Sequence, residues 1–152
     1  MRLIAKTLPY IALIFALVTG AHAQVMQLTP DEARTKALAG EIVLVDIRRP
    51  EEWAETGIAD VALTADMTSA GFIETLLDIR DQNPDVPLAL ICRTGNRSGY
   101  VTGELYKAGM TNVIDVVEGM AGSRIGPGWK VRGLPVRAAN APVNLQVAAI
   151  QP

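Results

Sequence analysis

One stretch of the sequence decides the fold: Leu88-Ala89-Leu90-Ile91-Cys92-Arg93-Thr94-Gly95-Asn96-Arg97-Ser98-Gly99. A short apolar run ends at the only cysteine of the chain. A tight loop with one glycine and two arginines follows, and Ser98 is placed to cap a helix that runs to about Gly109. A strand, a cysteine, an anion-cradling loop and a helix in this order predict a thiolate that handles an anionic sulfur or phosphorus group.

The rest of the chain alternates between buried strands and helices. Two further runs rich in β-branched residues, 41–47 and 112–117, have the pattern of strands buried on both faces of a parallel sheet. Short strands are also predicted within 24–28 and 58–63. The predicted helices cover 29–40, 50–55, 69–82 and 98–107, and a last helical piece begins near Trp129. The alternation predicts one α/β domain with a parallel sheet covered on both faces.

The N-terminus has the pattern of a bacterial-type signal peptide. Arg2 and Lys6 precede an apolar core at 8–18, which is too short to span a bilayer, and Ala21-His22-Ala23 forms a cleavage site. We therefore expect a signal peptide at 1–23, a domain at 24–137 and a loose C-terminal tail at 138–152, with a periplasmic or secreted, soluble mature protein. A retained membrane anchor is the alternative.

Composition excludes several classes of function. The 152 residues carry a net charge of −2, and cleavage removes Arg2 and Lys6, so nothing favours nucleic acid as a partner. His22, the only histidine, leaves with the signal peptide, which excludes Ser-His and Cys-His catalysis and histidine-ligated metals in the mature protein. Cys92 has no partner for an internal disulfide. It is a free reactive thiol, an intermolecular bridge or an inert core residue.

The surroundings of Cys92 favour the reactive thiol. The loop is short enough to curl with its backbone N–H groups pointing at the sulfur, and Gly95 allows the positive φ that such a turn requires. Arg93, Arg97 and the N-terminus of the next helix add positive charge, which stabilises a thiolate. Asp46 and Arg48 follow another strand at the same predicted edge of the sheet, either as part of the site or as an ion pair that holds the loop.

The loop resembles the active-site loop of the rhodanese family of sulfurtransferases. That loop has six residues and begins with cysteine, as Cys92–Arg97 does, whereas the loop of the related dual-specificity phosphatases is one residue longer. Two other parts of the chain also match the family. They are the Asp-x-Arg segment from Asp46 to Trp53, and the closing strand from Asn112 to Met120 with Trp129 and Gly133-Leu134-Pro135-Val136.

The chain departs from the family pattern in three places. The family's histidine after the short helix is absent from 56–61, and one glycine stands at 118–119 where two are common. The segment 123–128 looks inserted, and it could form a lip over the site with Arg124 facing it. Thr94 supplies a hydroxyl but no charge at a position that varies with the sulfur donor, so the donor stays open.

The resemblance implies a rhodanese-like α/β fold with a central parallel sheet of about five strands flanked by helices on both faces. It implies transfer of sulfane sulfur, from a donor such as thiosulfate to a thiol or cyanide, through a persulfide on Cys92, without a metal or organic cofactor. A protein sulfur acceptor is also possible. The implied substrate-binding residues are Arg93, Thr94, Gly95, Asn96, Arg97 and Ser98, with Asp46 and Arg48 in support. The alternatives are a slow sulfur-carrier or partner-binding module, and a phosphatase or arsenate reductase.

Overall fold

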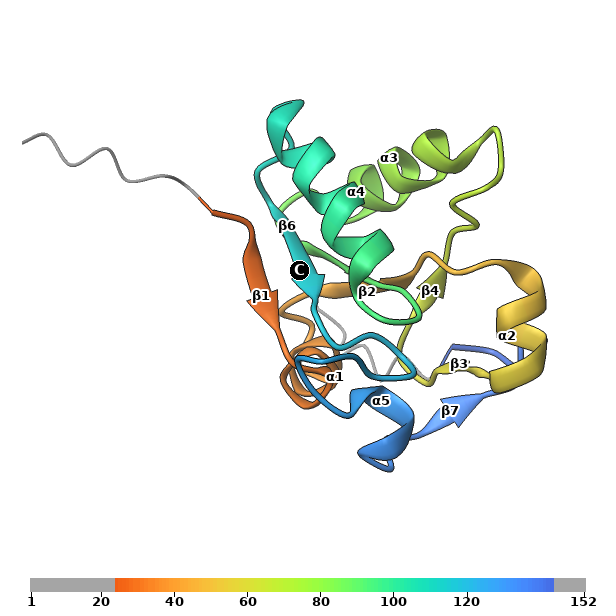
Figure 1. Ribbon diagram of the computed structural model, residues 1–152. Coiled ribbons are helices and arrows are strands. Elements are labelled where there is room, and N and C mark those ends of the chain that lie inside the picture. Colours follow the sequence, from red (N-terminus) through yellow and green to blue (C-terminus); the bar gives the residue numbers. More distant parts are fainter. Residues whose placement is uncertain (1–23, 144–152) are drawn as a thin grey trace, which may run out of the picture.

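A five-stranded parallel sheet forms the centre of the molecule in the computed structural model, which describes residues 24–143 (Figure 1). The signal peptide expected at 1–23 and the tail from 144 onward lie outside the described residues. The strand order is β1-β6-β5-β2-β4. The strands are β1 (Met26–Leu28), β2 (Val43–Asp46), β4 (Leu63–Thr64), β5 (Leu88–Ile91) and β6 (Val113–Val116).

Helices cover both faces of this sheet, as the alternation in the sequence predicts (Figure 1). On one face, α3 (Phe72–Gln82) and α4 (Asn96–Lys107) pack on Val45, Leu88 and Leu90. On the other face, α1 (Pro30–Leu38) and α5 (Gly128–Val131) pack on Leu44, Ala89 and Ile91. Alternate residues of β2 and β5 point to opposite faces, and both faces are covered. These strands are therefore apolar except for Asp46 at the end of β2. The expected fold class is therefore confirmed.

Two boundaries differ from the prediction. The strand expected within 58–63 is split by a turn in which Ala62 N–H donates to Ala59 carbonyl oxygen at 2.9 Å. Its first part, β3 (Ile58–Ala59), pairs antiparallel with β7 (Val136–Arg137), and its second part is β4 of the main sheet. The helix expected at 69–82 begins only at Phe72, because Gly71 caps it.

Two other helices, α1 and α2, begin where the sequence indicates. Thr29 and Glu32 form the expected capping box at the start of α1. Pro50 opens α2 (Pro50–Thr56), which follows β2. Among the helices of residues 24–143, none has the length and apolar character needed to cross a membrane.

The carboxyl ends of β2, β5 and β6 meet at one edge of the sheet, because the three strands are parallel and adjacent. Asp46 ends β2, Cys92 follows β5, and Val117 follows β6. The Asp46–Arg48 segment, the cysteine loop and the turn after β6 therefore lie at the same edge of the sheet.

Candidate active site

The loop that carries Cys92 is fixed by its contacts with the turn after β6. Met120 N–H donates to Cys92 carbonyl oxygen at 2.9 Å, and Ala121 N–H donates to Arg93 carbonyl oxygen at 2.8 Å. Gly95 has φ +84° and caps α4, and a Cβ atom there would collide with the carbonyl oxygen of Val117. Because only glycine fits this position, Gly95 sets both the curl of the loop and the start of α4.

Cys92 is fully enclosed, and its sulfur accepts a hydrogen bond from Ser98. The residue has no exposed surface, and Ser98 Oγ lies 3.5 Å from Cys92 Sγ and 3.1 Å from Gly95 carbonyl oxygen, so its one proton is shared between these two acceptors. The sequence predicted backbone N–H groups as the donors to this sulfur, whereas within residues 24–143 the donor is this side-chain hydroxyl. The prediction that Ser98 caps the helix is wrong, because α4 begins at Asn96 and Ser98 lies in its first turn. That position turns the hydroxyl inward.

Arg97 is held beside the loop by Glu52 of α2. Its Nη1 and Nη2 atoms donate to the two carboxylate oxygens of Glu52 at 2.8 and 2.7 Å. This bidentate pair lowers the pKa of Glu52 to about 2, chiefly through the hydrogen bonds from Arg97. It also raises the pKa of Arg97, and the nearby Cys92 adds to that rise. Arg97 thus keeps a fixed positive charge near the sulfur.

Glu52 is a site residue that was not predicted from the sequence. The residue lies inside the Asp46–Trp53 segment that carries the resemblance, but no role was assigned to it. The helix α2 buries Glu52, whereas its neighbour Trp53 is only partly buried. The available signal was an acidic residue three positions after Arg49, in the first turn of α2. Its carboxylate accepts a hydrogen bond from Arg49 N–H and also binds Arg97.

Asp46 and Arg48 form a buried ion pair that supports the loop. Arg48 is 1% exposed, and its Nη2 atom lies 2.7 Å from Asp46 Oδ2. The other donors of Arg48 bind Glu52 carbonyl oxygen, Thr56 Oγ1 and Gly57 carbonyl oxygen. Since these contacts engage all three guanidinium nitrogens, Arg48 anchors α2 and thereby positions Glu52.

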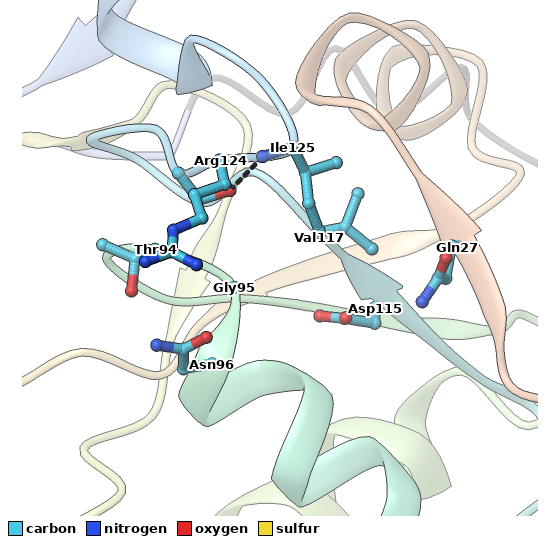
Figure 2. A pocket seen from close by; sticks show the side chains of 9 residues that line it. Gln27, Thr94, Gly95, Asn96, Asp115, Val117, Arg124 and Ile125 are labelled. Carbon is cyan, nitrogen blue, oxygen red and sulfur yellow. Dashed lines mark hydrogen bonds between the residues drawn. The ribbon is translucent and has the colours of Figure 1, made fainter.

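Two cavities adjoin the loop, and Cys92 is in the lining of neither. Arg93 is exposed and lines a cavity of about 170 Å³, together with Lys130 and the α2 residues Glu52 and Glu55. A larger cavity of about 590 Å³ lies on the other side of the loop (Figure 2). Its lining residues are Gln27, Thr94, Gly95, Asn96, Asp115, Val117, Ser123, Arg124 and Ile125.

The segment 123–128, which the sequence marked as inserted, forms one wall of the larger cavity. Glu118 holds the C-terminal end of this segment in place. Its carboxylate accepts a hydrogen bond from Gly128 N–H at 2.9 Å and forms an ion pair with Arg132 at 2.6 Å. Arg132 lowers the pKa of the Glu118 carboxyl. Arg124 reaches from this wall toward Thr94 of the cysteine loop (Figure 2).

The variant Glu52→Gln is expected to remove a pH-dependent part of the stability. A carboxyl whose pKa falls from 4.5 to about 2 on folding stabilises the native state fully above pH 4.5. That contribution is lost as the pH falls from 4.5 through about 2. In urea unfolding between pH 6 and 2, the free energy of unfolding of the parent should therefore fall more steeply than that of the variant. Parallel curves would contradict the role of Glu52, and Glu51→Gln, at an exposed neighbour, is the control.

Three comparisons place this chain among known proteins. The rhodanese-like domain family model matches residues 29–123. An uncharacterized protein of Rickettsia prowazekii is 29% identical over 98 residues, which cover 60% of this chain and 80% of that protein. A rhodanese-like domain protein from Staphylococcus aureus matches with 26% identity and a TM-score of 0.53, over 75% of this chain and 100% of that one. The polysulfide-sulfur transferase homodimer of Wolinella succinogenes matches with 26% identity and a TM-score of 0.58, over 76% of this chain and 80% of that one.

Proposed function

This chain belongs to the rhodanese-like domain family, and from that premise we propose that it transfers sulfane sulfur through a persulfide on Cys92. The family and the similarity to a polysulfide-sulfur transferase support a sulfurtransferase-type module. The single observation that carries the proposal is the position of Cys92. It follows β5, accepts a hydrogen bond from Ser98 and lies beside an arginine that Glu52 holds in place.

The reaction we propose has two steps. The Cys92 thiolate attacks the outer sulfur of a donor such as thiosulfate, the S–S bond of the donor breaks, and sulfite leaves with the bonding electron pair. The product is Cys92–S–S⁻. Cyanide or a thiolate then attacks the outer sulfur, and the electron pair of the broken S–S bond returns to Cys92 as thiolate.

Positive charge around the loop stabilises the anion that is formed. Arg97 interacts with Cys92, and the 12-residue helix α4 begins four residues after Cys92, so we assign both positive groups to the stabilisation of the outer sulfur. Arg93 and Lys130 line the smaller cavity, and we assign them to the attraction of the anionic donor. Thr94, Gly95 and Asn96 shape the loop between the two cavities.

A second candidate is a sulfur carrier with slow turnover, and the complete burial of Cys92 favours it. An enclosed sulfur limits the rate at which small acceptors remove the persulfide. In this case the persulfide forms, but it persists in the presence of cyanide and is released to a protein acceptor. The rate of thiocyanate formation separates the two candidates.

Intact mass spectrometry after incubation with thiosulfate tests the proposal. We expect a gain of one sulfur, about 32 Da, that dithiothreitol removes, because a persulfide is reduced by a dithiol. A chain that reacts neither with thiosulfate nor with polysulfide would refute persulfide chemistry. Release of phosphate from an aryl phosphate at a comparable rate would favour a phosphatase.

We further propose that the chain is exported and cleaved after Ala23, as the signal-peptide pattern predicts. Expression with its own N-terminus in a Gram-negative host should yield a periplasmic protein. N-terminal sequencing should begin at Gln24. Recovery of the uncleaved chain from the membrane fraction would instead indicate a retained anchor.

A further inference from the structure

The larger cavity beside the cysteine loop has the composition of a binding site for a small molecule. Its volume of about 590 Å³ is in the usual range for such sites. Three parts of the fold build it: the cysteine loop, the neighbouring strands β1 and β6, and the segment 123–125 (Figure 2). The proposed sulfur transfer uses the sulfur of Cys92, which does not line this cavity, so the cavity requires a separate explanation.

Asp115 supplies a buried carboxyl that lacks a hydrogen-bond donor. It belongs to β6, is 5% exposed, and its Oδ1 atom has no hydrogen-bond partner among residues 24–143. Figure 2 shows the carboxyl directed toward the start of α4 at one side of the cavity. Burial raises the pKa of this carboxyl, and the nearby Ser98 hydroxyl opposes that rise. Because a buried polar atom without a hydrogen-bond partner is unfavourable, a ligand that donates a hydrogen bond to this oxygen would stabilise it.

Arg124 supplies the opposite charge from the facing wall. It is exposed, and no ion pair or side-chain hydrogen bond engages it within the described part of the chain. Figure 2 shows its guanidinium near Thr94 and above Asn96, on the side of the cavity away from Gln27. An arginine fork in this position suits a carboxylate.

The charges at the two sides exclude simpler ligands. A plain anion would meet the carboxyl of Asp115, and a plain cation would meet Arg124. The cavity is also lined by the side-chain amides of Gln27 and Asn96 and by the apolar side chains of Val117 and Ile125. Amides can bind a peptide group, and the apolar side chains can cover an aliphatic segment.

We propose that this cavity binds a small zwitterion, an amino acid or a short peptide, with its ammonium group on Asp115 and its carboxylate on Arg124. Ser98 connects this site to the sulfur. Its hydroxyl lies 3.5 Å from Cys92 Sγ, and it opposes the rise that burial causes in the pKa of Asp115. Occupancy of the cavity should therefore alter the environment of Cys92. The proposed binding does not depend on sulfur transfer, so either proposal can fail without the other.

Titration of the full-length chain carrying Cys92→Ser with glycylglycine, followed by two-dimensional NMR, tests the site. We expect shifts at the amides of Gln27, Asn96 and Val117, and binding at least about tenfold weaker for N-acetylglycine and for glycinamide, each of which lacks one charge. Arg124→Gln and Asp115→Asn should each weaken binding about tenfold or more. Arg80→Gln, at a half-buried arginine of α3 that pairs with Asp81, should leave the affinity unchanged.

Three outcomes would overturn the proposal. They are equal binding of the three probes, unchanged affinity in Arg124→Gln, and no shifts at the lining residues. Should Asp115→Asn fail to fold, Arg124→Gln still decides, because its side chain is exposed and its loss leaves no buried group without a partner.

Discussion

Replacement of Cys92 by serine is expected to lower sulfur transfer from thiosulfate to cyanide by about 10³-fold or more. The hydroxyl of serine is almost entirely protonated at neutral pH, and it cannot form the S–S bond that carries the sulfur. Removal of a nucleophile that defines a two-step mechanism usually costs at least this factor. The measurement is the initial rate of thiocyanate formation at saturating thiosulfate.

Ser98→Ala is the matched control for this variant. It removes the hydrogen bond to Cys92 Sγ but keeps the nucleophile, and we expect a loss of about tenfold, the kinetic equivalent of one hydrogen bond. Serine and alanine differ little in volume, so the fold should persist. If Cys92→Ser retained the parent's activity, the persulfide mechanism would be wrong. If Ser98→Ala matched Cys92→Ser, Ser98 would have a larger part in the chemistry than one hydrogen bond explains.

The variant Asp46→Asn is expected to lower the free energy of unfolding by about 3–5 kcal/mol. It leaves the guanidinium of Arg48, which is 1% exposed, without a counter-charge in the interior. Because Arg48 also binds both ends of α2, the loss should release Glu52 and, through it, Arg97. Urea unfolding measures the first effect, and the rate of sulfur transfer measures the second.

The pair Arg80–Asp81 offers a control at the surface. The Arg80 side chain is 43% exposed and the Asp81 side chain is 66% exposed, so Asp81→Asn should change the free energy of unfolding by less than about 0.5 kcal/mol. A loss of similar size in Asp46→Asn would mean that water reaches Arg48 and compensates for the missing charge. The proposed link from Asp46 to the loop through α2 would then be wrong.

The layers of this fold can be predicted from the sequence because burial determines residue type. β2 and β5 are buried on both faces, so they consist almost entirely of apolar residues. They can be recognised in the sequence as continuous apolar runs, without an alternation of apolar and polar residues. Likewise, Thr29 and Pro30 mark the start of α1 by local chemistry alone. The antiparallel pair of β3 and β7 could not be predicted, since two-residue strands have no pattern and their pairing depends on the path of the chain between them.

The candidate site could be predicted only in part. Cys92 and its loop are contiguous, and Gly95 shows where the chain must turn, so local spacing is sufficient. Glu52 contacts Arg97 across 45 positions of sequence, and nothing near either residue indicates that contact. The orientation of Ser98 depends on whether α4 begins at Asn96 or two residues later. Helix propensities do not fix the first residue of a helix to within two positions. The sequence does not show that the carboxyl of Asp115 is buried, and only this burial marks the residue as part of a site.

The strand order also has a consequence for when the domain can fold. β1 is an edge strand, and its neighbour in the described sheet is β6. Met26 can therefore pair only after Ile114 has been synthesised. Contacts between segments so distant in sequence slow folding, because the loop between them must close before any pairing energy is gained. During synthesis, the N-terminal strand thus stays without its partner until most of the chain has left the ribosome. For a chain that we propose is exported, this delay extends the time during which it can be threaded through a membrane in an unfolded state.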